Sequence, residues 1–198
     1  MSKLGDPRHR HDAFFKKARG AGFAARSVYK LEEIDRKLRL LHPGDRVLDL
    51  GCRPGSWMQY ALKVVGPRGA VVGIDRDPLP QAIAGARVLC GDIYTTPDAE
   101  LLGPLAAFDV VLSDMAPNTT GVRSTDQARS AALVEEALAR AERLLAPGGG
   151  FVAKIFQGPE VAVLRKRVAT RFSEVRTLKP EGSRSESTEI YLGAKGFA

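Results

Sequence analysis

Cysteine and histidine are scarce in this chain, whose 198 residues include two Cys and three His. Cys52 and Cys90 stand in no metal-ligand spacing, so we interpret both as reduced thiols rather than as parts of a disulfide framework. These few Cys and His residues form no recognisable metal-binding motif. We therefore expect no metal ion and disfavour a metal enzyme.

Long apolar runs are also absent. No stretch approaches the roughly 20 consecutive apolar residues of a membrane helix, and the first residues carry charges where a signal peptide would need an apolar core. The length and the 44% content of hydrophobic residues fit one well-buried core. We therefore expect a monomeric, cytoplasmic protein without membrane contact, with residues 1–12 as a disordered basic tail and residues 13–198 as a single domain.

Two signatures of phosphate binding are missing as well. The dinucleotide pattern G-x-G-x-x-G would begin at Gly51, but its next glycines would fall on Arg53 and Ser56. The phosphate-loop ending G-K-[ST] occurs nowhere in the chain. An NAD-dependent dehydrogenase and a phosphate-loop protein are therefore disfavoured.

Positive charge is in excess, and it is concentrated at the two ends of the chain. The net charge is +7, with eight Lys and Arg against two Asp in residues 1–30 and nine basic against five acidic residues in 154–198. If the fold brings both ends to one face, the resulting surface suits a nucleic-acid backbone. A solubilising tail and a solvated helix face would explain the same charges equally well.

The hydrophobic pattern predicts an α/β fold. Predicted helices cover 27–38, with Ser27 as the N-cap, and then 56–65, 124–145 and 160–171; predicted strands cover 46–50, 70–75, 87–91, 108–114 and 150–156, followed by two short segments at 173–178 and 188–194. The strands have the near-continuous apolar character of strands covered on both faces. This alternation indicates a doubly wound, mostly parallel sheet that binds ligands at the carboxyl ends of its strands.

A glycine-rich turn follows the first predicted strand, in the stretch V-L-D-L-G-C-R-P-G-S-W at 47–57. Such a turn places backbone N–H groups and a helix N-terminus beside a ligand. Asp49, with Gly51 and Gly55 on either side of the bend, suits a ligand without phosphates that approaches the backbone closely. Asp75 ends the second strand, where it can accept hydrogen bonds from ribose hydroxyls, and Asp92 follows the third, where it can meet an adenine amine. Each acid alone could cap a turn, but together they favour a nucleoside cofactor.

Four further ionisable residues stand at predicted strand ends or in the basic flanks: Lys30, Asp114, Lys154 and Glu189. Lys154 interrupts the apolar run F-V-A-K-I-F at 151–156, and burying an unpaired ammonium there would be costly. Asp114 ends the adjacent strand and can supply a partner. A purely structural ion pair at the edge of the sheet remains the alternative.

Five ordered blocks of residues resemble one family, and the resemblance runs from about Phe14 to the C-terminus. The blocks are R-S-V-Y-K-L at 26–31, D-L-G-C-R-P-G-S-W at 49–57, S-D-M-A-P-N at 113–118, F-V-A-K-I-F-Q-G at 151–158 and R-S-E-S-T-E-I-Y at 184–191. The chain resembles the FtsJ/RrmJ (RlmE-type) ribose 2′-O-methyltransferases that act on large-subunit ribosomal RNA. The resemblance implies a Rossmann-like methyltransferase fold with one antiparallel strand near the C-terminus, and S-adenosylmethionine as the cofactor.

The resemblance also implies roles for residues. The family's K-D-K-E tetrad falls on Lys30, Asp114, Lys154 and Glu189, which would bring the two basic ends together at the active site. The expected cofactor pocket comprises Asp49, Gly51, Gly55, Ser56, Trp57, Asp75, Asp92 and Asp114. As a hypothesis, Lys154 is the base that takes the proton from the 2′-hydroxyl. The sequence departs from the family at Cys52 and Arg53, and Arg53 could either pair with an acid or face the RNA.

The implied activity is 2′-O-methylation of a ribose, that of a uridine, in 23S-type ribosomal RNA within the large subunit. Two alternatives stay open. The tetrad specifies the reaction but not which RNA is methylated, so a transfer RNA ribose is a second possible target. An RNA-binding ribosome assembly factor that has lost catalysis is the third reading.

The basic N-terminal flank generates the first prediction. Replacing Lys16, Lys17 and Arg19, each by Gln, should raise the KM for RNA. It should also reduce the magnitude of the slope of log binding constant against log salt concentration by about 2, because fewer phosphate contacts form and fewer counterions are released on binding. Binding titrations at several salt concentrations measure the slope. An unchanged slope would mean that this segment does not contact the RNA.

Overall fold

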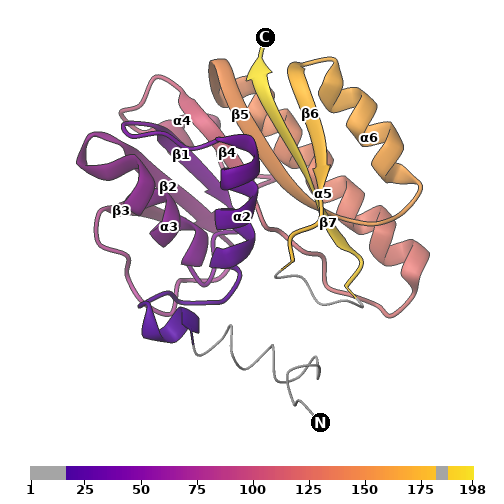
Figure 1. Ribbon diagram of the computed structural model, residues 1–198, viewed down its shortest axis with the longest axis horizontal. Helices are drawn as coiled ribbons and strands as arrows, with labels where there is room; N and C mark the ends of the chain where they lie inside the picture. The colour runs from indigo at the N-terminus through magenta and orange to yellow at the C-terminus, as the bar shows by residue number, and fades with distance from the viewer. Residues whose placement is uncertain (1–16, 182–186) are drawn as a thin grey trace.

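The computed structural model of the protein describes residues 17–181 and 187–198 (Figure 1). The predicted tail at 1–12 lies outside the described residues. The helices are α2 (Val28–Leu38), α3 (Ser56–Val65), the short 3₁₀ helix η2 (Gly66–Arg68), α4 (Asp98–Leu102), α5 (Arg123–Leu144) and α6 (Glu160–Ala169). The strands are β1 (Arg46–Leu50), β2 (Ala70–Asp75), β3 (Ala86–Cys90), β4 (Phe108–Ser113), β5 (Leu145–Phe156), β6 (Phe172–Leu178) and β7 (Glu189–Phe197).

All seven strands form one sheet in the order β3-β2-β1-β4-β5-β7-β6. In this order, each strand from β3 through β5 is paired in parallel with its neighbour. The strand β7 is inserted between β5 and β6 and is antiparallel to both. The expected mostly parallel sheet with one antiparallel strand near the C-terminus is therefore confirmed. The expectation that every strand is covered on both faces is wrong for β3, which lies at the edge of the sheet and is only partly buried.

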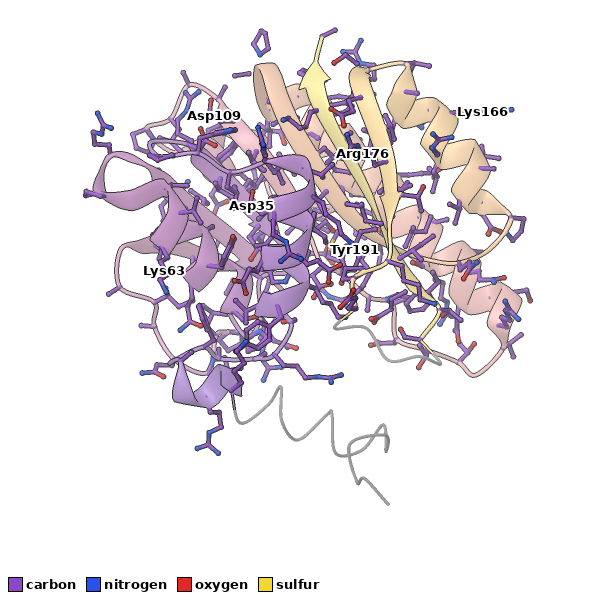
Figure 2. All side chains as sticks on the ribbon, in the orientation of Figure 1. Asp35, Lys63, Asp109, Lys166, Arg176 and Tyr191 are labelled. Atoms are coloured by element: carbon purple, nitrogen blue, oxygen red, sulfur yellow. The ribbon has the colours of Figure 1, made fainter. Side chains whose placement is uncertain are left out.

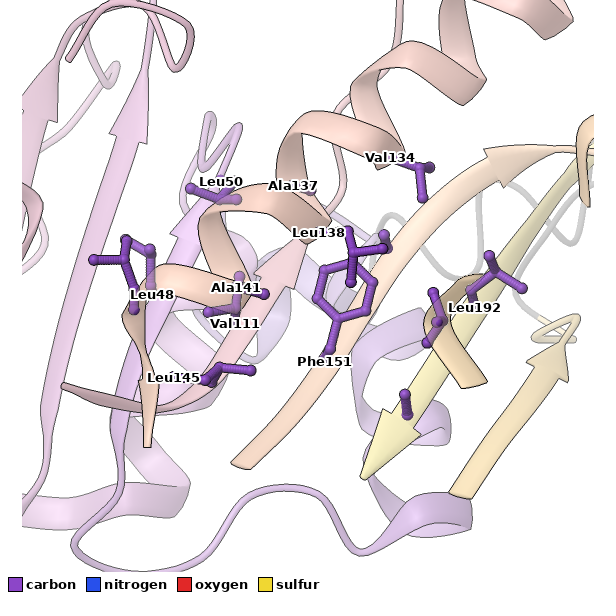
Figure 3. Close-up of a cluster of buried hydrophobic side chains, with 14 of the residues drawn as sticks. Leu48, Leu50, Val111, Val134, Ala137, Leu138, Ala141, Leu145, Phe151 and Leu192 are labelled. Carbon is purple, nitrogen blue, oxygen red and sulfur yellow. The ribbon is translucent and has the colours of Figure 1, made fainter. Parts of the chain in front are cut away.

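Helices cover both faces of the sheet, and successive residues along each strand point to opposite faces. Val47, Val71 and Val110 belong to the cluster of buried residues that includes α2 and α3. Their neighbours in the strands pack with α5 and α6 in a second cluster. Figure 3 shows part of this cluster, with the apolar side of α5 lying over β1, β4 and β5. The sheet thus has two cores, and its face toward α2 and α3 also carries the polar residues of the site.

The start of α2 is fixed by α3. The helix begins directly after Ser27, as predicted, but the Ser27 hydroxyl does not cap it. That hydroxyl instead lies 2.8 Å from the hydroxyl of Ser56, and the Trp57 indole N–H donates to the Ser27 carbonyl at 2.9 Å. Ser27 is therefore the N-cap residue, as predicted, but its hydroxyl bonds a residue from a distant part of the chain instead of a backbone N–H of the helix. Both contacts hold α2 in place over the sheet.

None of the helices in the described part of the chain is long and apolar enough to cross a membrane. The longest, α5, has a buried face and a polar face.

Candidate functional site

A cavity of about 540 Å³ lies at the carboxyl ends of β1 to β4. Its lining includes Gly51 after β1, Asp75 at the end of β2, Asp92 after β3 and Asp114 after β4. We call it the strand-end cavity. A doubly wound sheet offers its ligand site at this edge, so the cavity lies where the sequence pattern predicted it.

The two glycines of the turn both need to be glycine. Gly51 and Gly55 have φ angles of +75° and +108°, in the left-handed region that side chains disfavour. A Cβ on Gly51 would lie 2.5 Å from Met115 Cγ, and one on Gly55 would lie 2.3 Å from Ile83 Cδ1. The turn is therefore packed tightly against the segments that follow β4 and β2.

Asp49 is the most unusual residue near the cavity. It is 1% exposed, and neither of its carboxylate oxygens has a hydrogen-bond partner in the described part of the chain. Burial, followed by the negative charges of Asp114 and Asp75, raises the pKa of Asp49 well above its ordinary value. A positively charged ligand in the strand-end cavity would offset this concentration of negative charge.

Asp75 and Asp92 are held by backbone N–H groups. The two oxygens of Asp75 accept hydrogen bonds from the N–H groups of Arg53 and Asp77, each at 3.0 Å. Asp92 Oδ1 accepts the N–H of Tyr94 at 2.9 Å. Since a carboxylate has about four acceptor positions, both side chains keep acceptor positions free for a ligand while their orientation is fixed.

The two residues that depart from the family pattern have distinct places. The Arg53 guanidinium lies 4.0 Å from an Asp77 oxygen and lines the strand-end cavity, which favours the first of the two alternatives for this residue. Cys52 is buried, and burial, followed by the charges of Asp49 and Asp75, raises the pKa of its thiol. The thiol therefore stays protonated, as a reduced core residue.

Four predicted cofactor residues do not line the strand-end cavity: Asp49, which lies buried close to it, and Gly55, Ser56 and Trp57. Ser56 and Trp57 are buried and make the contacts to Ser27 described above, and the Trp57 ring also lies against Tyr191, with centroids 5.8 Å apart. Their part in cofactor binding stays a prediction. The side chains of Ser56 and Trp57 join the turn to the start of α2.

The structure brings the four residues of the predicted tetrad together. Lys30 Nζ on α2 lies 2.7 Å from Glu189 Oε2 at the start of β7. Lys154 Nζ on β5 lies 3.1 Å from Asp114 Oδ1 and also donates to the Asp114 carbonyl. The basic N-terminal and C-terminal parts of the chain therefore meet here, as the sequence predicted.

The pleat of the sheet explains why these side chains meet. Lys154 is paired with Tyr191 across β5 and β7, and Glu189 precedes Tyr191 by two residues, on the same face. Ser113 is paired with Ala153, so Asp114 follows β4 beside Lys154. The helix α2, which carries Lys30, covers this face.

Tyr191 is a site residue that the sequence reasoning missed. Its hydroxyl donates to Asp114 Oδ1 at 2.8 Å, and Figure 2 shows it beside α2, where β7 begins. Burial, followed by the charge and hydrogen bond of Asp114, raises its pKa well above the ordinary value, so the phenol remains a donor. The spacing E-I-Y, which places Glu189 and Tyr191 on one face of a strand, could have identified it.

Opposing effects act on Glu189. Burial by itself would raise the pKa of this carboxyl, but the charge and hydrogen bond of Lys30, together with Lys154, lower it below the ordinary value. Glu189 therefore stays ionised at neutral pH. The stabilisation from this pairing is present above the ordinary glutamate pKa and is lost as the pH falls through the lowered one.

A second cavity, of about 630 Å³, adjoins the Lys30–Glu189 pair. Its lining includes Arg26, Arg123 and Gln127, together with Lys30 and Glu189, and we call it the basic cavity. Asp114 belongs to the strand-end cavity and is bonded to Lys154. The tetrad thus spans the two cavities, which suits a reaction between two bound molecules.

Comparison with known proteins identifies relatives over nearly the whole chain. A model of the FtsJ-like methyltransferase family matches residues 23–197. The chain is 49% identical to the ribosomal RNA large subunit methyltransferase E of Sorangium cellulosum, over 94% of this chain and 88% of that protein. It is 50% identical to the protein of the same name from Syntrophobacter fumaroxidans, over 91% and 93% of the two chains. A crystal structure of a putative ribosomal RNA methyltransferase from Plasmodium falciparum has a TM-score of 0.78 and 27% identity, covering 88% of this chain and 98% of that one.

The unpartnered carboxyl of Asp49 generates a prediction about stability. In the protein without ligand, Asp49→Asn should raise the free energy of unfolding at pH 7.5, because the neutral amide lacks the charge that burial and the neighbouring Asp114 and Asp75 disfavour. Because the folded-state pKa is raised, the cost of Asp49 is absent below the ordinary aspartate pKa and grows as the pH rises, so the gain should vanish near pH 3.5. Urea unfolding at both pH values measures it. An equal effect at the two pH values would contradict the electrostatic account.

Proposed function

This chain belongs to the FtsJ-like methyltransferase family, and we propose that it methylates the 2′-oxygen of a ribose, that of a uridine, in 23S-type ribosomal RNA. It is a methyltransferase that uses S-adenosylmethionine. The observation that carries the proposal is the tetrad, in which the Lys154–Asp114 and Lys30–Glu189 pairs lie between the strand-end cavity and the basic cavity.

The strand-end cavity fits the cofactor. S-adenosylmethionine has no phosphates, and its positive sulfonium and ammonium groups suit the Asp75, Asp92 and Asp114 carboxylates of the lining. Arg53, Arg76 and Arg129 also line the cavity and would suit its carboxylate. In our proposal Asp49, Gly51, Asp75, Asp92 and Asp114 hold it, and the buried, unpartnered carboxyl of Asp49 is the observation that supports a cationic ligand. When bound, the cofactor supplies an electrophilic methyl group.

The basic cavity fits the RNA. Arg26 and Arg123 are suited to phosphate oxygens, which position a nucleic acid without reading its sequence. Gln127 in the same lining can both donate and accept hydrogen bonds and is therefore suited to a base or a ribose. The names of the bacterial relatives support large-subunit ribosomal RNA as the target. We propose that the enzyme acts on the large subunit in the cytoplasm.

The catalytic role of Lys154 follows from its place. A ribose hydroxyl is a poor nucleophile at neutral pH, so a group within hydrogen-bond reach must accept its proton during attack. Lys154 is 6% exposed, and its Nζ is oriented by the carboxylate and carbonyl of Asp114. We assign Lys154 in its neutral amine form, which has a free lone pair, as the proton acceptor and Asp114 as the group that holds it.

Lys30 and Glu189 would orient the ribose rather than accept its proton. Glu189 is kept ionised by Lys30, so it can accept a hydrogen bond from a sugar hydroxyl. Correct alignment of two bound reactants can contribute roughly 7–11 kcal/mol to lowering a barrier. Much of the acceleration is therefore expected from positioning by both cavities.

Replacing Lys154 separates chemistry from binding. Lys154→Ala should reduce kcat by at least about 100-fold, the lower range for loss of a general base, while the Kd for S-adenosylmethionine changes little. Transfer of labelled methyl to unmodified large ribosomal subunits, together with calorimetric binding, measures both quantities. Lys195→Ala is the matched control, because Lys195 lies on β7, the strand paired with β5, and among the described residues its Nζ bonds the carbonyls of Leu38 and Arg39. An equal loss of cofactor binding in Lys154→Ala would refute its role as base.

The target RNA is tested in the same assay. We expect label in a 2′-O-methylated nucleoside from large subunits and none in bulk transfer RNA. Label in transfer RNA would preserve the chemistry and overturn the target. Cofactor binding without label in either RNA would instead support an RNA-binding assembly factor.

A further inference from the structure

One wall of the strand-end cavity has little support from the sheet. Gly91, Asp92, Ile93 and Tyr94 line the cavity just beyond β3, which is the edge strand and is only partly buried. Residues 91–97 belong to no strand and connect β3 to α4. We call residues 91–97 the β3–α4 segment. The N–H of Gly91 donates to the Asp75 carbonyl of β2 at 2.9 Å, and beyond this bond the position of the segment depends on contacts from outside the sheet.

Within the β3–α4 segment, a tight turn orients Asp92. The Asp92 carbonyl accepts the N–H groups of Thr95 at 3.1 Å and Thr96 at 2.9 Å, and also the Thr96 hydroxyl at 2.8 Å. The Asp92 carboxylate accepts the N–H of Tyr94. These contacts make the turn a rigid unit, so whatever holds the turn also places the Asp92 side chain. The Ile93 side chain packs in the core cluster that includes α5, but a polar attachment for the carbonyls of the turn has to come from elsewhere.

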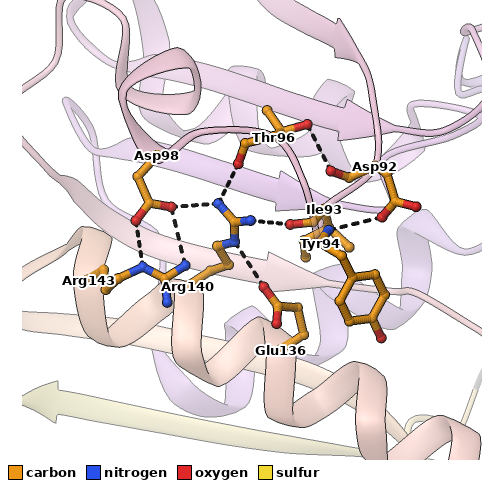
Figure 4. Close-up of polar contacts among 8 residues, drawn as sticks. All are labelled: Asp92, Ile93, Tyr94, Thr96, Asp98, Glu136, Arg140 and Arg143. Atoms are coloured by element: carbon orange, nitrogen blue, oxygen red, sulfur yellow. Dashed lines mark hydrogen bonds and ion pairs between the residues drawn. The ribbon is translucent and has the colours of Figure 1, made fainter.

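Arg140 on α5 makes that attachment (Figure 4). Its side chain is 6% exposed, and its guanidinium donates to the carbonyl of Thr96 at 2.7 Å and to the carbonyl of Ile93. The planar fork of an arginine can bond two carbonyls in a fixed geometry, which a lysine cannot reproduce. Arg140 thus joins both sides of the turn to α5.

Two acids balance the buried charge of Arg140. Its guanidinium lies 2.6 Å from Asp98 Oδ1 and 3.0 Å from Glu136 Oε1. Hydrogen bonds from Arg143 and Arg140 lower the pKa of Asp98 despite its partial burial, so the carboxyl stays ionised. A buried arginine with two carboxylates and two carbonyls has its charge and its donors satisfied, and its orientation is fixed.

The helix that carries Arg140 also forms another part of the cavity. Arg129, Ala132 and Leu133 of α5 line it, and Glu136 and Arg140 follow Leu133 by about one and two turns. One helix therefore positions two walls of the same cavity, the first directly and the second through Arg140. The distance between the walls depends on the Arg140 fork.

We propose that Arg140 is a positioning residue of the cofactor site, which sets the affinity for S-adenosylmethionine by holding the β3–α4 segment and Asp92 in place without lining the cavity. The proposal rests on the cofactor of the family and not on the choice of RNA. This role requires the geometry of the guanidinium as well as its charge. Arg140→Lys, which preserves the charge, should therefore still lose it.

The variant Arg140→Lys tests this, with Arg143→Lys as its matched control. Arg143 bonds the same Asp98, but it is about half exposed and has no hydrogen bond to the β3–α4 segment. We expect Arg140→Lys to raise the calorimetric Kd of S-adenosylhomocysteine, the demethylated product, at least 10-fold. Arg143→Lys should stay within 2-fold. Hydrogen exchange of the amides of residues 94–96 should accelerate only in Arg140→Lys.

Kinetics separate positioning from a general loss of structure. Arg140→Lys should raise the KM for S-adenosylmethionine, while kcat at saturating cofactor stays within about 2-fold of the parent. A lower melting temperature with an unchanged Kd would overturn the proposal. If neither the parent nor the variants bound S-adenosylhomocysteine, the cofactor assignment itself would fail. This outcome can be distinguished from failure of the Arg140 proposal, in which the parent and Arg140→Lys bind with the same Kd.

A second variant keeps the test decisive if Arg140→Lys does not fold. Asp98→Ala removes a partly exposed carboxylate that orients Arg140 and leaves the carbonyls in place. It should raise the Kd of S-adenosylhomocysteine at least 3-fold relative to Arg143→Lys. A value within 2-fold of that control would refute the role of Arg140.

Discussion

The antiparallel pairing of β7 with β5 is the contact on which the catalytic end of this protein depends. The register places Tyr191 opposite Lys154 and Glu189 opposite Phe156. Lys154, Tyr191 and Glu189 therefore share one face of the sheet, beneath α2. A slip of one residue would turn the β7 side chains to the opposite face and leave Lys154 without these neighbours. The inserted strand thus has a chemical role beyond completing the sheet.

Both cavities are lined by charges of both signs, and the strand-end cavity also lies close to the buried carboxyl of Asp49. Asp49, Asp75 and Asp114 lie close enough for the last two to raise the pKa of the first, a concentration of negative charge that costs stability. The linings also contain the opposite sign: Arg53, Arg76 and Arg129 line the strand-end cavity, and Asp126 and Glu189 line the basic cavity beside Arg26, Lys30 and Arg123. The two ligands would therefore be separated by the positions of particular charges and not by the overall sign of each cavity. The Lys–Asp and Lys–Glu pairs of the tetrad lie where these regions meet.

The sequence predicted much of the fold because its strands are short apolar runs bounded by turn residues. The bounds of β1 and β2 were predicted to the residue, and those of α3 as well. The start of β5 was predicted at Gly150. In the structure β5 begins at Leu145, which pairs with Phe108 before an irregularity in the ladder. The partial exposure of β3 was missed because an apolar run does not reveal that its strand lies at an edge.

The sequence by itself determined the succession of most strands and helices and the glycine turn that packs tightly at the strand-end cavity, because both follow from local spacing. The four tetrad residues were predicted from the resemblance to the FtsJ/RrmJ family, and the high cost of burying an unpaired charge in an apolar strand singled out Lys154 among them. Only the tertiary structure decided which groups meet: Lys30 with Glu189, Tyr191 with Asp114, and Arg140 with the carbonyls of Ile93 and Thr96. These partners come from elements far apart in the chain. Their distances are set by sheet register and helix packing, which no short stretch of sequence specifies.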